Sequence, residues 1–225
     1  GEVPNPIKSA FLAGETVTVE DNTGELSKDG YVFKGWNTKA DGTGIFYEPG
    51  DTFEMSEESV VLYACWELEQ YTVTFTDWDD SILDEQTVDY GNAATAPLDP
   101  SRTGYTFTGW DKDFDSISSD ITIKAVYAIN SYTITFDTAG GSNVESLTQD
   151  FDTDITAPAD PEKEGYTFTG WTPVLPSKMP AEDSNITALW NINQYELKVK
   201  YIMEDGSVAP DVNISFVEYN SEYSV

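Results

Sequence analysis

The sequence predicts a tandem array of small, mainly β repeats, and three observations support this fold class. The pattern Gly-Tyr-x-Phe-x-Gly-Trp begins at Gly30, again at Gly104 and again at Gly165. Alternating apolar segments before and after this pattern recur in the same order. Aromatic residues make up 13% of the chain, and large aromatic side chains favour half-buried strands. We therefore expect strands to form most of the regular structure.

The second copy shows the expected order of elements most clearly. Residues 71–75 alternate aromatic or aliphatic side chains with Thr, and residues 82–88 follow after a polar turn, so a β-hairpin is predicted. Residues 92–100 contain two prolines and are predicted to cross the repeat as a loop with a helical turn. Residues 104–110 and 121–128 are predicted as the third and fourth strands.

The chain divides into four predicted units. These are a first repeat at residues 1–69, a second at 70–130, a third at 131–193 and an incomplete fourth unit at 194–225. The first repeat lacks its first strand and has a longer loop after Trp36. The fourth unit is expected to form a strand from Tyr195, a turn at 204–206 and a second strand near 213–219.

The stretches between the units are only a few residues long. They lack the Gly/Ser or Pro runs of flexible linkers. We therefore expect an elongated, semi-rigid, monomeric array that is part of a longer protein.

The charge balance excludes several kinds of partner. The chain has 41 Asp and Glu against 11 Lys and Arg, a formal net charge of -30. Such a surface repels nucleic-acid phosphates and anionic lipid headgroups, so no nucleic-acid partner is expected. No apolar run approaches the roughly 18 residues of a membrane span, so no direct membrane insertion is expected.

The residue types also argue against an enzyme. The chain has no histidine and a single cysteine, Cys65, which removes His-based triads, Cys/His zinc sites and disulfides within the chain. Paired carboxylates occur in glycosidases, but among 41 acids some pairs will lie close by accident, and nothing indicates a deep cleft. No catalytic residue and no cofactor are assigned.

These landmarks resemble the Listeria–Bacteroides repeat, also called the internalin B-repeat family. The resembling residues are the Tyr-Thr-Val-Thr-Phe strand from Tyr71, the Gly-Tyr-x-Phe-x-Gly-Trp pattern and the closing Ala-Leu-Trp strand that ends at Trp190. The tail from Tyr195 resembles the start of a mucin-binding-protein-type repeat. Both resemblances imply β-grasp-like, mixed-sheet folds in secreted, wall-attached bacterial surface proteins, and neither carries catalytic residues.

The Gly-Trp tryptophans, Trp36, Trp110 and Trp171, have two alternative placements. Period-two alternation puts Trp110 on the face opposite Tyr105 and Phe107. A bulge at the preceding glycine would turn the tryptophans back onto the core. Otherwise they would stay exposed in a row as possible contacts for sugars or a protein partner.

The remaining landmark residues are predicted to form the repeat cores. In the Gly-Tyr-x-Phe strands and in the closing strands, the recurring apolar residues occupy every second position. The residues of each strand should therefore share one buried face. This predicted core contains Tyr31, Phe33, Tyr105, Phe107, Tyr166, Phe168, Leu62, Ala64, Trp66, Ile123, Ala125, Tyr127, Ile186, Ala188 and Trp190. Cys65 is matched by Val126 and Leu189, so it is predicted to occupy an apolar slot as an inert packed thiol.

A calcium site is the one metal hypothesis that the sequence offers. Asp111, Asp113 and Asp115 alternate in one loop, and oxygen-rich loops can hold Ca²⁺. The loop lacks the glycine of an EF-hand and has Thr122 where a bidentate Glu belongs. A solvated acidic loop is the alternative.

Together these patterns predict a non-catalytic repeat region of a bacterial cell-surface protein. It would act as a stalk or spacer, with a role in adhesion, and would be extracellular and attached to the cell wall. The first alternative is a module that binds a glycan or a host protein through exposed aromatic side chains. The second is a calcium-stiffened rod.

Overall fold

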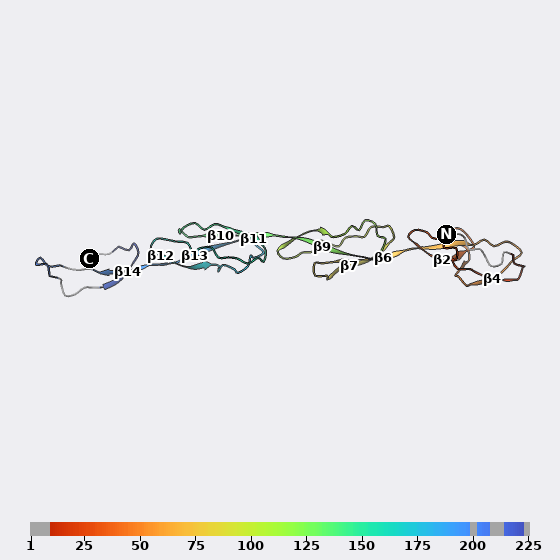
Figure 1. Ribbon diagram of the computed structural model, residues 1–225, viewed down its shortest axis with the longest axis horizontal. Helices are drawn as coiled ribbons and strands as arrows, with labels where there is room; N and C mark the ends of the chain where they lie inside the picture. The colour runs from red at the N-terminus through yellow and green to blue at the C-terminus, as the bar shows by residue number, and fades with distance from the viewer. Residues whose placement is uncertain (1–9, 199–201, 208–213, 223–225) are drawn as a thin grey trace. The chain divides into compact units, whose positions relative to one another are not determined.

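A four-stranded mixed sheet forms the second repeat. A computed structural model of the chain describes residues 10–198, 202–207 and 214–222 (Figure 1). The sheet contains β6 (Gln70–Thr76), β7 (Ile82–Asp89), β8 (Tyr105–Trp110) and β9 (Ile121–Ile129) in the order β7-β6-β9-β8. β6 pairs antiparallel with β7 and parallel with β9. All four predicted strands and the predicted hairpin are confirmed.

The third repeat has the same topology. Its strands are β10 (Ser131–Asp137), β11 (Leu147–Asp150), β12 (Tyr166–Thr172) and β13 (Ser184–Ile192), in the order β11-β10-β13-β12. The strand that opens the repeat, β10, lies parallel to the strand that closes it, β13. The mixed sheets confirm the predicted fold class.

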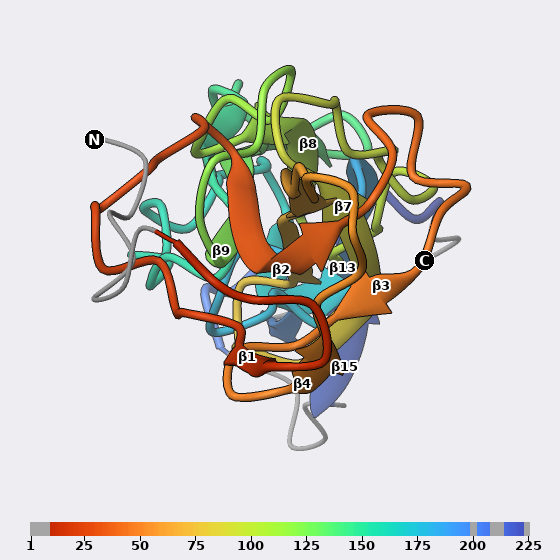
Figure 2. The same cartoon turned by 90° about the vertical axis from the view of Figure 1, so that its right-hand side faces the viewer.

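The first repeat uses a smaller sheet and a separate β-ribbon. Its sheet has the order β3-β2-β5, from β2 (Tyr31–Asn37), β3 (Phe46–Tyr47) and β5 (Tyr63–Leu68). β1 (Thr16–Thr18) pairs antiparallel with β4 (Thr52–Glu54), beside each other in Figure 2. The long segment predicted as a loop after Trp36 therefore supplies two short strands.

The fourth unit contains an antiparallel hairpin. β14 (Gln194–Lys198) pairs with β15 (Ile214–Glu218) in a two-stranded sheet. Both predicted strands are present, with the turn at residues 204–206 between them. Residues 199–201, which carry part of the mucin-binding-type resemblance, and the predicted strand start at Asn213 lie outside the described residues.

The crossing segment of the second repeat has no helical turn, which corrects the expectation for residues 92–100. The side-chain amide of Gln86 explains the difference. Its Nε2 donates to the carbonyl of Thr95 at 2.8 Å, and its Oε1 accepts from the amide of Thr95 at 2.9 Å. These two bonds pair the backbone amide and carbonyl of Thr95, as a neighbouring β-strand would. In addition, Pro97 disfavours helical dihedral angles at the residue before it. Since the described residues contain no helix, they contain no helix that could span a membrane.

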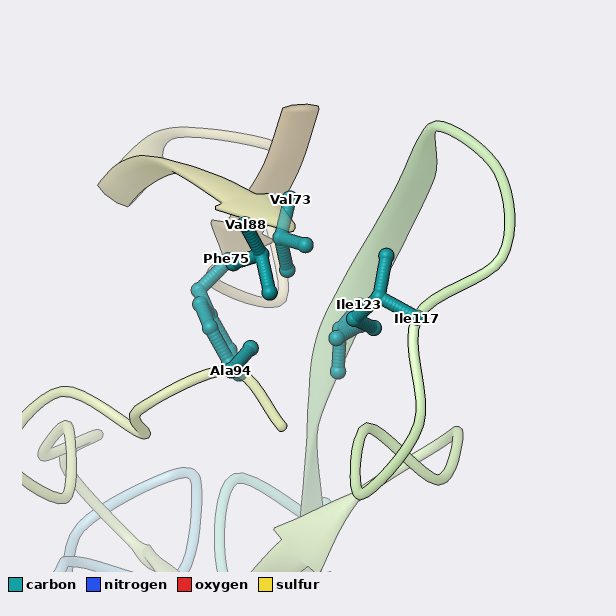
Figure 3. Close-up of a cluster of buried hydrophobic side chains, with 6 residues drawn as sticks. All are labelled: Val73, Phe75, Val88, Ala94, Ile117 and Ile123. Carbon is teal, nitrogen blue, oxygen red and sulfur yellow. The ribbon is translucent and has the colours of Figure 1, made fainter. Parts of the chain in front are cut away.

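Each four-stranded sheet buries one face over its own core. In the second repeat the core consists of Val73, Phe75, Val88, Ala94, Ile117 and Ile123 (Figure 3). In the third it consists of Ile134, Phe136, Met179 and Ile186. Burying one large apolar side chain stabilises the fold by about 1.5–3 kcal/mol, so each cluster can hold a small repeat together.

The chain forms two compact units. One contains Gly1–Pro100 with Thr108–Val126, and the other contains Ser101–Phe107 with Tyr127–Val225. The division runs through the second repeat. The Gly-Tyr turn of that repeat therefore belongs to the same unit as the third repeat.

Candidate functional site: the junctions between repeats

A tight turn precedes the Gly-Tyr strand in each of the three repeats. The amide of the tyrosine donates to the carbonyl of a basic residue three positions earlier, at 3.0–3.1 Å. The glycine between them has a φ of 72°, 77° and 78° in the three copies, in the region that glycine adopts without strain. The three turns therefore share one backbone conformation, and they run from Lys28 to Tyr31, from Arg102 to Tyr105 and from Lys163 to Tyr166.

The basic residue of each turn covers the tyrosine ring. Lys28 Nζ lies 3.5 Å from the centroid of Tyr31, and Arg102 Cζ lies 3.7 Å from that of Tyr105. Lys163 repeats the contact at 4.5 Å. Cation–π contacts of this kind contribute about 0.5–1 kcal/mol at exposed sites. Three of the chain's 11 basic residues thus lie over tyrosine rings of the repeats.

One linker residue joins each repeat to the next through its backbone. The amide of Glu69 donates to the carbonyl of Gly30 at 2.9 Å, while its carbonyl accepts from the amide of Tyr90 at 2.8 Å. We call this arrangement the first junction. The second junction, through Gly104, Asn130 and Phe151, and the third, through Gly165, Asn193 and Tyr219, repeat both bonds at 2.8–2.9 Å.

An aromatic ring covers the glycine at every junction. A methyl group in place of the Gly30 hydrogen would overlap the ring of Tyr90. Phe151 covers Gly104 and Tyr219 covers Gly165 in the same way. The glycines are buried and the rings are half-buried. Glycine is therefore required here both by its positive φ and by the close approach of the ring.

The sequence prediction missed these three aromatic residues. Each one directly follows the strand that its hairpin contributes, after an acidic residue and before a residue of positive φ: Gly91, Asp152 or Asn220. A recurring acidic–aromatic pair followed by Gly, Asp or Asn could have identified them.

Carboxylates accept hydrogen bonds from tyrosine hydroxyls at the first and third junctions. Tyr90 Oη donates to Asp29 at 2.9 Å, and this bond raises the pKa of Tyr90. A hydrogen bond from Tyr219 to Glu164 likewise raises the pKa of Tyr219. At the first junction the hydroxyl of Tyr71 also donates to Glu69 at 2.5 Å.

The Gly-Trp tryptophans lie against the repeat cores and do not form an exposed row. The pairing register shifts between Phe33 and Gly35, so a bulge turns the following Trp36 inward. Trp36 is 6% exposed. Trp110 and Trp171 are half-buried, with ring centroids 4.9 Å from Phe75 and 5.0 Å from Phe136, respectively. Their rings are therefore used in packing.

The closing strands bury the predicted alternate positions. Ile123, Ala125, Ile186 and Ala188 are buried. The other predicted core residues are half-buried. They are the tyrosines and phenylalanines of the Gly-Tyr-x-Phe strands, the closing aromatic residues Trp66, Tyr127 and Trp190, and Leu62 and Ala64.

The predicted apolar slot around Cys65 is wrong. The matching Val126 and Leu189 point outward and are 41% and 45% exposed, because the buried positions alternate with them along the strand. Cys65 is half-buried on the corresponding outer position.

The acidic loop of the second repeat does not gather its carboxylates. Asp111 Oδ1 accepts a hydrogen bond from the amide of Lys124 at 2.6 Å, and Asp113 Oδ1 accepts one from the amide of Asp115 at 3.0 Å. Across the described part of the chain, no three metal-ligating side chains come together. These carboxylates fix backbone turns.

An open groove lies in the third repeat. Its lining includes Gly141, Tyr166 and Trp190. The ammonium of Lys163 lies over the rings of Tyr166 and Trp190 and donates to the carbonyl of Ala139 at 2.9 Å. The ring faces that could have stacked on a ligand are thus partly covered by this side chain.

The repeats and their junctions define a tandem-repeat protein, and sequence comparison identifies the family. The model of the Listeria-Bacteroides repeat domain matches residues 3–65, 71–130 and 132–187, so the chain belongs to this family.

Proteins similar to this chain include three from two bacteria. A putative Gly-rich membrane protein of Evansella cellulosilytica is 37% identical over 235 residues, covering 96% of this chain and 27% of the relative. A putative membrane protein of the same organism is 32% identical over 88% of this chain and 32% of its own length. Internalin H of Listeria monocytogenes is 37% identical over 114 residues, covering 46% of this chain and 20% of its own length. The chain spans less than a third of each of these relatives.

Proposed function

We propose that this chain is a non-catalytic spacer in a bacterial cell-surface protein. The three repeated junctions carry the proposal. In each of them one linker residue bonds to both neighbouring repeats, and one aromatic ring covers a buried glycine. Such contacts resist bending between neighbouring repeats, as a spacer requires.

The use of the remaining residues supports a structural role. Trp110 and Trp171 of the family pattern pack against the cores, and the phenylalanines of the pattern pack on the closing aromatic residues. The basic residues of the turns cover tyrosine rings. The Gly-Trp tryptophans, on which the ligand-binding alternative was based, are used in packing. The names of the relatives, two putative membrane proteins and an internalin, support a location at the cell surface.

Relaxation of backbone ¹⁵N nuclei in the full chain tests the spacer role. We expect the amides of the second and third repeats to report one shared rotational correlation time. A flexible joint would give each repeat the faster tumbling of a body of about 60 residues, and that result would contradict the proposal. The elongated form of the array stays a prediction, which small-angle scattering would test.

The cellular location is tested separately. Antibodies raised against this chain should label intact cells of the source bacterium, and protease added to those cells should remove the label. Labelling only after the cells are broken would overturn the surface location.

A further inference from the structure

The residue before each junction glycine varies together with the aromatic residue that covers it. Asp29 precedes Gly30 and accepts a hydrogen bond from Tyr90 at 2.9 Å. Glu164 precedes Gly165, which the ring of Tyr219 covers, and its carboxylate raises the pKa of that tyrosine.

At the second junction both members of this pair change. Thr103 precedes Gly104, and the covering residue is Phe151, which has no hydroxyl. Two junctions therefore combine a carboxylate with a phenol, and one junction combines a threonine with a phenyl ring.

This difference has a direct physical cause. A phenol opposite a carboxylate gains a charge-assisted hydrogen bond, as Tyr90 does with Asp29. A carboxylate beside a phenyl ring would gain no such bond, and a threonine offers a phenol only a weaker, neutral acceptor. Taken together, the carboxylate–phenol and threonine–phenyl pairs are therefore more favourable than the two mixed pairs.

We propose that the residue before the junction glycine, together with the aromatic residue of the following repeat, determines which repeat can follow which. The Gly-Tyr turn of each repeat is then a selective docking surface. Its partner is a β-hairpin that ends in Tyr where the turn carries Asp or Glu, and in Phe where the turn carries Thr. Repeats of the family would be exchangeable within one type of junction and would pair poorly across types.

The backbone bonds of each junction are common to all three copies, so they cannot discriminate. Selectivity must come from side chains. The second junction has Arg102 where the others have Lys28 and Lys163, but all three lie over the tyrosine of their own turn. The acid–hydroxyl pair is the difference that reaches across the junction to the covering ring.

Two double-mutant cycles in the full chain test this proposal. The gain cycle combines Thr103→Asp with Phe151→Tyr at the second junction. Protection from hydrogen exchange is measured at the amides of Asn130 and residue 151, which make the junction bonds. We expect Phe151→Tyr to raise protection about three- to tenfold more in the Thr103→Asp background than in the native one, as a hydrogen bond to a charged acceptor would.

The loss cycle combines Asp29→Ala with Tyr90→Phe at the first junction. Tyr90→Phe should lower protection of the Glu69 and Tyr90 amides about three- to tenfold in the native chain, with little further loss in the Asp29→Ala background. Additive effects in either cycle would overturn the proposal.

The amides of Asn193 and Tyr219 at the untouched third junction provide an internal reference, because a general folding defect would change them too. The inference rests on the proposed spacer role, but the two can fail separately. Additive cycles with shared tumbling would overturn only the pairing rule, while independent tumbling would overturn the spacer.

Discussion

The indole of Trp36 donates from Nε1 to the backbone carbonyl of Glu20 at 2.8 Å, across 16 residues of sequence. Replacing Trp36 with Phe would keep a ring in the core but leave that carbonyl without its partner. We expect the first repeat to lose about 1–3 kcal/mol of stability, measured by urea unfolding of the full chain. Trp78→Phe is the control, since this side chain is 47% exposed, and it should cost less than about 1 kcal/mol. Equal losses would show that the bond to Glu20 contributes nothing.

The glycine at the second junction can be tested against a matched glycine. Gly104 and Gly91 have φ angles of 77° and 79°, but only Gly104 is covered by a ring. Gly91→Ala should cost about 1–2 kcal/mol through the backbone alone. Gly104→Ala should cost about 2–5 kcal/mol, because Phe151 must also move. Thermal unfolding of both variants measures the difference, and equal costs would mean that the ring yields freely.

Gln86 fixes the crossing segment of the second repeat through both of its amide atoms. Gln86→Ala would leave the amide and carbonyl of Thr95 without these partners. We expect a loss of about 1–3 kcal/mol and faster hydrogen exchange at the Thr95 amide. The neighbouring Thr87→Ala, on the exposed face of the same strand, should change stability by no more than about 0.5 kcal/mol. Unchanged exchange at Thr95 would contradict the assigned role.

The stability of the first junction should depend on alkaline pH. The hydrogen bond to Glu69, with burial and the charge of that carboxylate, raises the pKa of Tyr71 from 10.0 to about 12. A raised pKa favours the neutral phenol in the folded chain. The stability that the neutral Tyr71 phenol contributes is fully present below pH 10. It is lost as the pH rises towards about 12. A titration followed by tyrosinate absorbance should show one tyrosine, Tyr71, that ionises near pH 12. Glu69→Gln should lower the pKa of Tyr71 back towards 10. A titration unaffected by Glu69→Gln would refute the assignment.

Strand order and strand phase could be predicted from the sequence because they follow from local alternation. The segments around Phe75, Phe107 and Ile123 each form the expected strand. The placement of Trp171 could not be derived from alternation alone, because the bulge between Phe168 and Gly170 changes the phase by one residue. The sequence offered both placements, and the pairing of β12 with β13 decides between them.

Local sequence patterns could not predict contacts between residues that lie far apart in the sequence. Tyr90 reaches Asp29 across 61 residues, and no periodicity links these two positions. The bonds from Gln86 to Thr95 likewise replace a helical turn with an extended segment. Val126 and Leu189 are apolar yet exposed, which shows that an interchangeable apolar position need not be buried.

The parallel pairing of β10 with β13 has a mechanical consequence. β10 opens the third repeat and β13 closes it, and their register runs from Ile134 opposite Ser184 to Asp137 opposite Thr187. Tension applied to the two ends of the repeat pulls these strands in opposite directions along their length. Their hydrogen bonds are then loaded together in shear, and none can open before the others. Single-molecule pulling should therefore show a higher rupture force for the third repeat than for the antiparallel hairpin of β14 and β15, whose bonds can open one at a time.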